Sequence, residues 1–178
     1  FADLECPACR RAYAPLSEFV KKHAGEVQLV FRHYPLDQKC NPSMRRVLHE
    51  YACDAAMAAE SAGMQGKFFE YVDSVYRLTD EQGVMITKPD LRREALVERA
   101  RKLGLDVAQF EAGLTSEESL DKILVHLADG DAFGVESTPT IYANGRLVKG
   151  VPIDTNTLKI WLAMAKNGEL DPPKSSSM

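Results

Sequence analysis

Two cysteines separated by two residues give this sequence its clearest capacity for chemistry. Cys6 and Cys9 enclose Pro7 and Ala8, and such a CxxC motif fits a redox-active dithiol, a zinc site or a haem attachment site. Pro7 suits the first turn of a helix, where its missing N–H costs nothing. A cysteine directly before a helix has its thiolate stabilised by the free N–H groups and the dipole of that helix. Because the thiolate is the nucleophile, we expect a solvent-accessible Cys6 to exchange with a substrate sulfur and Cys9 to resolve the mixed disulfide.

A metal site is the main alternative for this motif. Zinc bound by Cys6 and Cys9 would need two more ligands, but Cys40 and Cys53 lack the spacing of a second CxxC motif. The histidines fall on different predicted elements, and they are His23, His33, His49 and His126. We therefore expect no metal and no other cofactor, and ordinary surface or strand roles for the histidines.

The elements that must position the motif begin with a helix and a strand. Residues 7–23 carry an apolar stripe that ends before Gly25, which predicts a helix that Pro15 should kink. Residues 27–34 (VQLVFRHY) are β-branched and aromatic and lie between Gly25 and Pro35, which predicts a strand.

A long helical block is predicted from about residue 48 to residue 134. A face of small side chains should allow close helix packing, and it consists of Ala52, Ala55, Ala56 and Ala59. Three pairs resemble the caps that open helices, namely Thr87 with Asp90, Asp106 with Gln109, and Thr115 with Glu118.

A hairpin and a helix follow this block. Residues 140–143 and 146–149 flank Asn144-Gly145, the dipeptide that a type I′ hairpin turn favours. Asp154 is expected to cap the last helix, and Gly168 to close it.

Length and charge limit the classes of protein. The chain has 178 residues and a net charge of −4, which favours a single domain over residues 1–170 with a flexible tail at 171–178. The negative charge disfavours nucleic acid as the main partner. No apolar run approaches the roughly 20 residues that span a bilayer. The chain starts with Phe1, so we expect a trimmed or processed start from which an export signal or anchor is missing.

The segment Ser137-Thr138-Pro139-Thr140 lies about 130 residues after the CxxC motif and directly before the hairpin. Together with the motif it resembles the thioredoxin superfamily, which implies a cis Thr138–Pro139 bond with Pro139 against the cysteine pair. The backbone of Thr138 would then bind the substrate chain like a short added strand. The implied fold class is α/β, a thioredoxin fold with a central sheet, a CxxC helix, a cis-Pro hairpin and a helical insertion.

Four segments narrow the resemblance to the DsbA-like branch of bacterial thiol oxidoreductases. They are FADLECPAC (1–9), FRHYPL (31–36), AAMAAE (55–60) and QGKFF (65–69). In addition, Cys40-Asn41 with Ala52-Cys53 is similar to domains that partner, or are fused to, vitamin K epoxide reductase-type membrane quinone reductases. By position, Asp3 and Glu5 are candidates for the acidic residue that precedes CxxC in many relatives.

This resemblance implies a dithiol oxidase that introduces disulfides into exported proteins. Its substrates would be proteins with cysteines, held by Thr138, Pro7 and Ala8, and a quinone-linked membrane protein would reoxidise it. The expected location is periplasmic or otherwise extracytoplasmic, with a possible tether before Phe1. Pro7-Ala8 departs from the Pro-His dipeptide of DsbA, so we expect lower oxidising power. A reductase or isomerase on the same fold, and a redox-inactive peptide-docking module, are the alternatives.

A structural disulfide between Cys40 and Cys53 is expected within this resemblance. Bridged cysteines need Cα atoms about 4.4–6.8 Å apart, whereas a continuous helix from Pro42 would place Cys53 about 16 Å away. The helix and the disulfide therefore exclude each other. We expect the disulfide, because the alternative leaves two lone thiols in a chain that exchanges thiols. Residues 41–47 should then fold back as a loop, with a helix beginning near Leu48 or His49.

Overall fold

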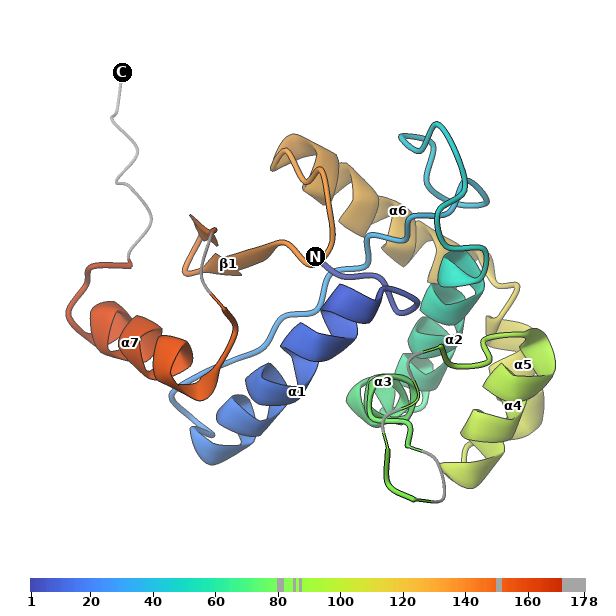
Figure 1. The fold of residues 1–178 in the computed structure, drawn as a ribbon. Coiled ribbons are helices and arrows are strands. Elements are labelled where there is room, and N and C mark those ends of the chain that lie inside the picture. Colours follow the sequence, from blue (N-terminus) through green and yellow to red (C-terminus); the bar gives the residue numbers. More distant parts are fainter. Residues whose placement is uncertain (80–81, 85, 87, 150–151, 171–178) are drawn as a thin grey trace. The chain divides into compact units, whose positions relative to one another are not determined.

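The structure, a computed structural model, describes residues 1–79, 82–84, 86, 88–149 and 152–170 (Figure 1). The chain divides into two compact units, one formed by residues 1–10 and 31–139 and the other by residues 11–30 and 140–178. The single domain predicted over residues 1–170 stays a prediction. The predicted tail at 171–178 lies outside the described residues.

The helix α1 (Pro7–Lys22) follows the CxxC motif as expected. It begins at Pro7, continues through Pro15, and ends with Lys21 and Lys22 in its last turn, where positive charge complements the helix dipole. Gly25 comes after the helix with a φ of +86°. The first four residues of α1 belong to the first unit and the remainder to the second.

The first unit is built around α2 (Ala52–Met64). This helix contacts four others, which are α3 (Phe68–Tyr76), α4 (Arg93–Lys102), α5 (Val107–Gly113) and α6 (Glu117–Ala132). Figure 1 shows α2 among them. The predicted small-residue face is confirmed, because Ala52, Ala55, Ala56 and Ala59 are at most 2% exposed. Side chains this small let neighbouring helices approach closely.

The caps of these helices agree in part with the sequence. Asp106 caps α5 as predicted, and its carboxylate accepts a hydrogen bond from the Gln109 N–H. For α6 the cap is Ser116, whose hydroxyl accepts from the Ser119 N–H, so the assignment of Thr115 was wrong by one residue. The Thr87 cap lies outside the described residues.

The strand predicted over residues 27–34 forms only one isolated bridge. Ala2 pairs in parallel with His33, through hydrogen bonds from Ala2 N to Arg32 O and from Tyr34 N to Ala2 O, both 2.8 Å. The chain turns at Leu4 and Glu5, directly after Ala2. The turn ends the pairing, and the remaining residues of this segment are extended without a ladder.

The second unit contains the predicted hairpin. The strands β1 (Ile141–Ala143) and β2 (Arg146–Val148) pair antiparallel. Asn144 and Gly145 both have positive φ, +48° and +79°, as a type I′ turn requires. The helix α7 (Thr155–Lys166) begins after Asp154, whose carboxylate accepts from the Thr157 N–H as predicted.

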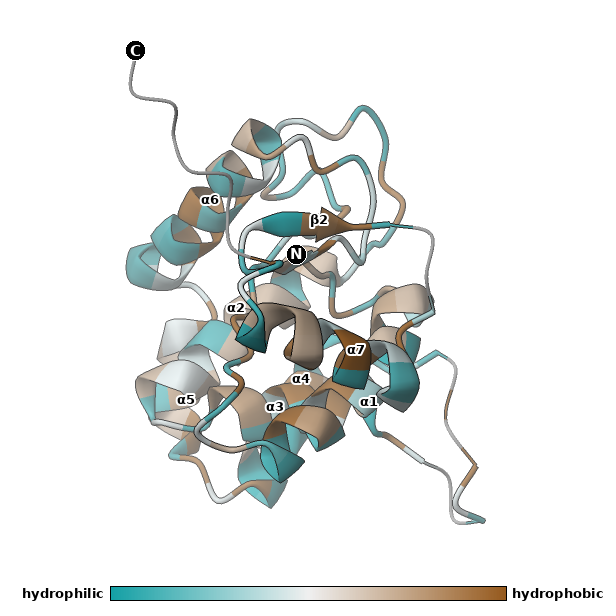
Figure 2. Ribbon diagram, turned by 90° about the vertical axis from the view of Figure 1, so that its left-hand side faces the viewer, coloured by the Kyte–Doolittle hydropathy of each residue, from teal (hydrophilic) through white to brown (hydrophobic). Residues whose placement is uncertain are grey.

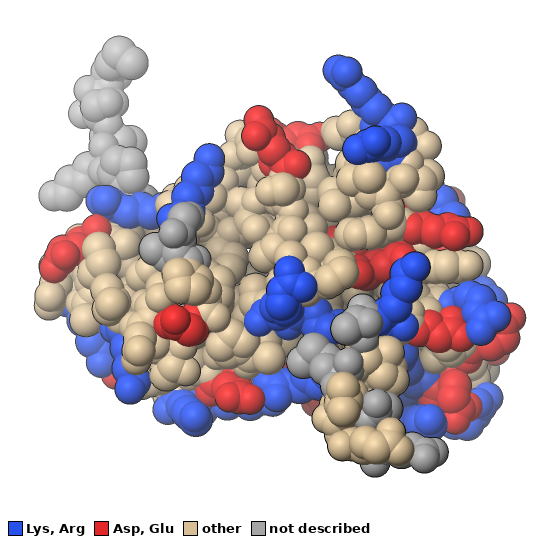
Figure 3. Space-filling view, viewed as in Figure 1, with Lys and Arg blue, Asp and Glu red and all other residues tan. Residues whose placement is uncertain are grey.

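The helices are amphipathic and the visible surface carries mixed charge. In Figure 2 both α6 and α7 combine hydrophobic and hydrophilic residues. On the face seen in Figure 3, basic and acidic side chains are interspersed. Within the described part of the chain, no helix combines the length and the apolar character needed to cross a bilayer.

Candidate active site

Cys6 and Cys9 are placed by the start of α1, and both are free thiols. Cys6 directly precedes the first helical residue, Pro7, and Cys9 lies in the first turn. The expectation of a solvent-accessible Cys6 was wrong, because Cys6 is only 6% exposed and Cys9 only 2%. The physical reason is the segment at Thr138, whose carbonyl oxygen lies 3.5 Å from the Cys6 sulfur. Pro7 between the cysteines is exposed.

The surroundings make the two thiols chemically unequal. A hydrogen bond from the Cys9 thiol lowers the pKa of Cys6 to about 5 from its ordinary value of 9.0. Burial opposes this change, whereas Thr138 and the backbone N–H groups of Cys9 and Ala8 reinforce it. Burial, followed by the neighbouring Cys6, raises the pKa of Cys9. Near neutral pH, Cys6 is therefore a thiolate and Cys9 a thiol.

Thr138 and Pro139 reach this pair from the far end of the first unit. The Thr138–Pro139 peptide bond is cis, as the sequence predicted. The Thr138 carbonyl oxygen lies beside the Cys6 sulfur, and the buried Thr138 hydroxyl has no hydrogen-bond partner among the described residues. Contact of Pro139 with the sulfurs, and substrate binding by Thr138, Pro7 and Ala8, stay predictions.

Asp3 connects the cysteine motif to the remainder of the unit. Its backbone carbonyl accepts from the Cys6 N–H at 3.1 Å and from the Tyr76 hydroxyl at 2.7 Å, while its N–H lies 3.5 Å from the Cys9 sulfur. Its buried carboxylate accepts from the Glu5 N–H at 2.7 Å and from the Leu36 N–H at 2.8 Å. Of the two acidic candidates, Asp3 and Glu5, it is thus Asp3 whose backbone contacts both cysteines.

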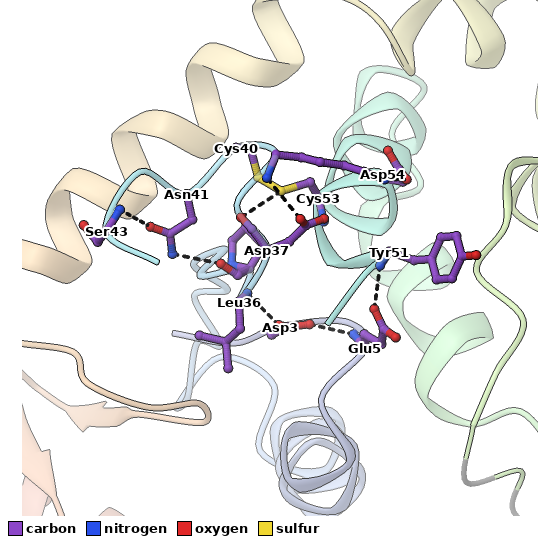
Figure 4. Close-up of a disulfide and its surroundings, with 12 residues drawn as sticks. Asp3, Glu5, Leu36, Asp37, Cys40, Asn41, Ser43, Tyr51, Cys53 and Asp54 are labelled. Atoms are coloured by element: carbon purple, nitrogen blue, oxygen red, sulfur yellow. Dashed lines mark hydrogen bonds and ion pairs between the residues drawn. A yellow bond between two sulfur atoms is a disulfide. The ribbon is translucent and has the colours of Figure 1, made fainter. Parts of the chain in front are cut away.

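The expected disulfide between Cys40 and Cys53 is present, with Cα atoms 5.9 Å apart (Figure 4). It packs in an apolar cluster with Tyr34, Ala56, Ile123, Leu127 and Val135. The Cys53 N–H and its disulfide sulfur lie against Asp37, and Asn41 donates to the Pro35 carbonyl at 2.8 Å. These contacts hold the loop against Pro35 and Asp37, so the loop folds back as predicted.

The helix after this loop begins later than predicted, at Ala52 instead of Leu48 or His49. The backbone N–H groups of Leu48 and His49 both donate to the Leu36 carbonyl at 3.1 Å, and the Tyr51 N–H donates to a Glu5 carboxylate oxygen at 2.7 Å. Figure 4 shows the Glu5–Tyr51 contact. Because these N–H groups bind to other segments, the loop extends to Tyr51.

His49 is the site residue that the sequence did not reveal. Its Nδ1 lies 2.8 Å from a carboxylate oxygen of Asp3, and its side chain is 21% exposed. His33 and His126, which the sequence placed on different elements, stack their rings with centroids 5.7 Å apart. The predicted disulfide indicated that the loop returns to the motif, but no sequence signal indicated which of its side chains would meet Asp3.

The zinc alternative has little support in this arrangement. Cys40 and Cys53 are joined to each other, so they cannot complete a site with Cys6 and Cys9. In the described residues, no three His, Cys, Asp or Glu side chains are grouped in a manner that could hold a metal ion.

Comparison with known proteins agrees with this site. Residues 1–163 match the model of a family described as thioredoxin. A thioredoxin-like oxidoreductase from Silicibacter pomeroyi has a similar crystal structure, with a TM-score of 0.72 and 25% identity over 93% of this chain and 83% of that one. The oxidoreductase DsbA from Xylella fastidiosa has a TM-score of 0.68 over 94% of this chain and 84% of its own, and at 19% identity it supports the fold alone.

The curated relatives are much longer proteins. The Na(+)/H(+) antiporter NhaA 1 of Mycobacterium sp. (strain KMS) is 33% identical over 161 residues, which are 89% of this chain and 23% of the relative. This chain therefore spans about a quarter of the length of the curated relatives that it matches.

Proposed function

This chain belongs to the thioredoxin family and is a thiol:disulfide oxidoreductase domain, and from that premise we propose that Cys6 and Cys9 form a dithiol oxidase centre. In each cycle a substrate thiolate attacks the Cys6 sulfur of the oxidised pair, and the Cys6–Cys9 bond breaks. A second substrate thiolate then attacks the mixed disulfide and releases Cys6. The substrate dithiol loses two electrons, and the Cys6–Cys9 disulfide gains them and becomes a dithiol.

The observation that carries the oxidase direction is the position of Cys6 directly before α1, where the Cys9 thiol and the first N–H groups of the helix lower its pKa to about 5. A thiol with a lower pKa is a better leaving group, and a stabilised thiolate favours the reduced enzyme, so the oxidised pair is a stronger oxidant. The value lies between about 7 for thioredoxin, a reductant, and about 3.5 for DsbA, an oxidant. An oxidant weaker than DsbA also agrees with Ala8 in place of histidine.

Partner and location form part of the same proposal. An oxidase must be reoxidised after each cycle, and a quinone-linked membrane protein could accept the two electrons. The Cys40–Cys53 disulfide supports an oxidising, extracytoplasmic compartment. The matching segment in relatives named Na(+)/H(+) antiporters supports an attachment to a membrane protein. Substrates would be exported proteins that contain cysteines.

Equilibration of the Cys6/Cys9 pair with glutathione tests the direction of the reaction. We expect a reduction potential closer to the value of about −120 mV for DsbA than to about −270 mV for thioredoxin. A potential near −270 mV would instead assign the domain as a reductase. Failure to exchange with glutathione at all would favour a redox-inactive docking module.

A further inference from the structure

The loop closed by the Cys40–Cys53 disulfide carries one ionisable side chain to the cysteine motif. His49 is anchored at its backbone N–H, which donates to the Leu36 carbonyl at 3.1 Å, and at its ring, where Nδ1 lies 2.8 Å from the Asp3 carboxylate. The Glu5–Tyr51 hydrogen bond at 2.7 Å fixes the end of the same loop. Hydrogen bonds therefore fix both the backbone and the imidazole ring of His49.

Asp3 connects this histidine to the cysteine pair, because Asp3 contacts both His49 and the cysteines. The backbone of Asp3 binds the Cys6 N–H at 3.1 Å and lies 3.5 Å from the Cys9 sulfur, while its carboxylate is fully buried. The charged groups that face His49 are Asp3, Cys6 and Glu5. The hydrogen bond to Asp3 raises the pKa of His49; burial opposes this, and the charges of Asp3, Cys6 and Glu5 add to the increase.

We propose that His49 is a positioning residue of the exchange reaction: its imidazolium, held by Asp3, stabilises the Cys6 thiolate of the reduced enzyme, and the Cys40–Cys53 disulfide holds the loop that places it. The inference rests on the proposed function in that Cys6 and Cys9 must be the exchanging pair. The disulfide then acts on catalysis through the position of His49, in addition to any effect on stability.

The proton balance of the reaction gives His49 a defined task. When a substrate dithiol reduces the Cys6–Cys9 bond, two protons leave the substrate sulfurs. Cys9 takes one proton and becomes a thiol, and Cys6 remains a thiolate. The second proton binds to His49 where this residue is neutral in the oxidised enzyme, and passes to solvent at lower pH, where His49 is already protonated.

The direct test is the pKa of His49 in the two redox states, measured by NMR titration of its imidazole in the wild-type protein. Coupling between two sites is reciprocal, so a histidine that stabilises the Cys6 thiolate must have a higher pKa in the reduced protein than in the oxidised one. His23 is the matched control, because its Nδ1 also binds a carboxylate, Glu26, at 3.0 Å. It follows the last residue of α1, 17 residues after Cys6, so reduction of the cysteine pair should leave its imidazole signals unchanged.

Variants test the role of the disulfide. In His49→Gln the titration midpoint of Cys6 should rise by about half a pKa unit, which lowers the alkylation rate at pH 4.5 about threefold. The paired variant Cys40→Ser/Cys53→Ser should show a similar change. Combining it with His49→Gln should add little, because both act through the same contact.

Two outcomes would overturn the inference: an equal His49 pKa in both redox states, or a Cys6 titration that His49→Gln leaves unchanged. The proposed function is judged separately, by oxidation of a dithiol peptide. A protein that oxidises the peptide without the His49 coupling contradicts this inference alone. A protein that shows the coupling without oxidising the peptide contradicts the proposed function alone.

Discussion

Cys6 and Cys9 begin as identical thiols three residues apart, and three neighbouring groups make them different. Cys6 accepts hydrogen bonds from the Cys9 thiol and from N–H groups at the start of α1, and all of these favour its anion. Cys9 is surrounded by protein, and burial disfavours its anion. Each thiol therefore has the protonation state that suits its part in the proposed oxidation, with Cys6 as the attacked sulfur and Cys9 as the sulfur that is released as a thiol in the first step.

The first prediction concerns this difference. Alkylation of the reduced protein should modify Cys6 before Cys9, with a midpoint near the pKa of about 5, because the reagent reacts with the thiolate. Peptide mapping after brief alkylation at pH 6 identifies the modified residue. In Cys9→Ser the Cys6 thiolate should attack a substrate disulfide and release one substrate thiolate, and the resulting mixed disulfide should accumulate because no Cys9 thiol remains to resolve it. Cys6→Ser serves as the control and should trap nothing. Faster modification of Cys9 would reverse the assigned roles.

At the scale of elements, sequence predicts best what short-range contacts decide. The Asp106 and Asp154 caps and the Asn144-Gly145 turn depend on residues two or three positions apart, and all three are confirmed. The start of α2 and the strand at 27–34 depend on distant partners. Leu36 and Glu5 hold the N–H groups that would have begun the helix, and within the described part of the chain the strand is paired only by the bridge at Ala2.

The same distinction between short-range and long-range contacts applies to the residues of the candidate site. Cys6, Cys9 and Thr138-Pro139 could be named in advance because motif and order identify them. His49 could not, because a residue 43 positions after Cys6 meets Asp3 only through the folded loop. A prediction that used the disulfide as a distance restraint could have limited the candidates to the side chains of residues 41–51.

Two helical glycines provide a matched test of packing around α2. A Cβ at Gly113 of α5 would lie 2.7 Å from the Ser61 Cβ and 3.2 Å from its Cα, and it would also meet the Ser61 hydroxyl. Gly113→Ala should therefore destabilise the fold by about 1–3 kcal/mol through overpacking. Gly63→Ala, whose Cβ would meet the Phe68 ring at 3.4 Å, should instead stabilise it by about 0.5–1 kcal/mol.

Urea unfolding of the two variants measures this contrast. The opposite signs distinguish packing from helix propensity, which alone would stabilise both. Equal stabilisation of both variants would contradict the close approach of α5 to α2.

At the scale of the whole molecule, the proposed site lies within one of the two compact units. Cys6, Cys9, Asp3, His49 and Thr138 all belong to the first unit, so the network around the sulfurs is complete there. The second unit contains most of α1 and the hairpin that follows Pro139. Both segments are joined covalently to the site, one directly after Cys9 and Arg10 and the other directly after the cis bond.

The Cys6 thiolate also links the stability of the whole molecule to its redox state. In the reduced protein, the pKa of Cys6 falls on folding from 9.0 to about 5, so between these values the unfolded chain binds more protons than the folded one. Stability therefore rises with pH in this range and the contribution disappears below about pH 5. The oxidised protein has no such thiolate and gains nothing from it.

We therefore predict that the stability of the reduced protein increases relative to that of the oxidised protein as pH rises from 5 to 6.5. The pKa of His49 is raised from 6.5, so the contribution of this histidine is lost mainly above this window, and Cys6 dominates the change within it. A rise of 1.5 pH units corresponds to about 2 kcal/mol, which solvent screening should reduce to about 1 kcal/mol.

Urea unfolding of both forms at each pH measures the difference, with the Cys40–Cys53 disulfide kept intact by mild reduction. Cys6→Ser, which cannot form the thiolate, should lose the increment. A difference that stays constant or shrinks with pH would mean that folding does not stabilise the thiolate, and the oxidase assignment would lose its physical basis.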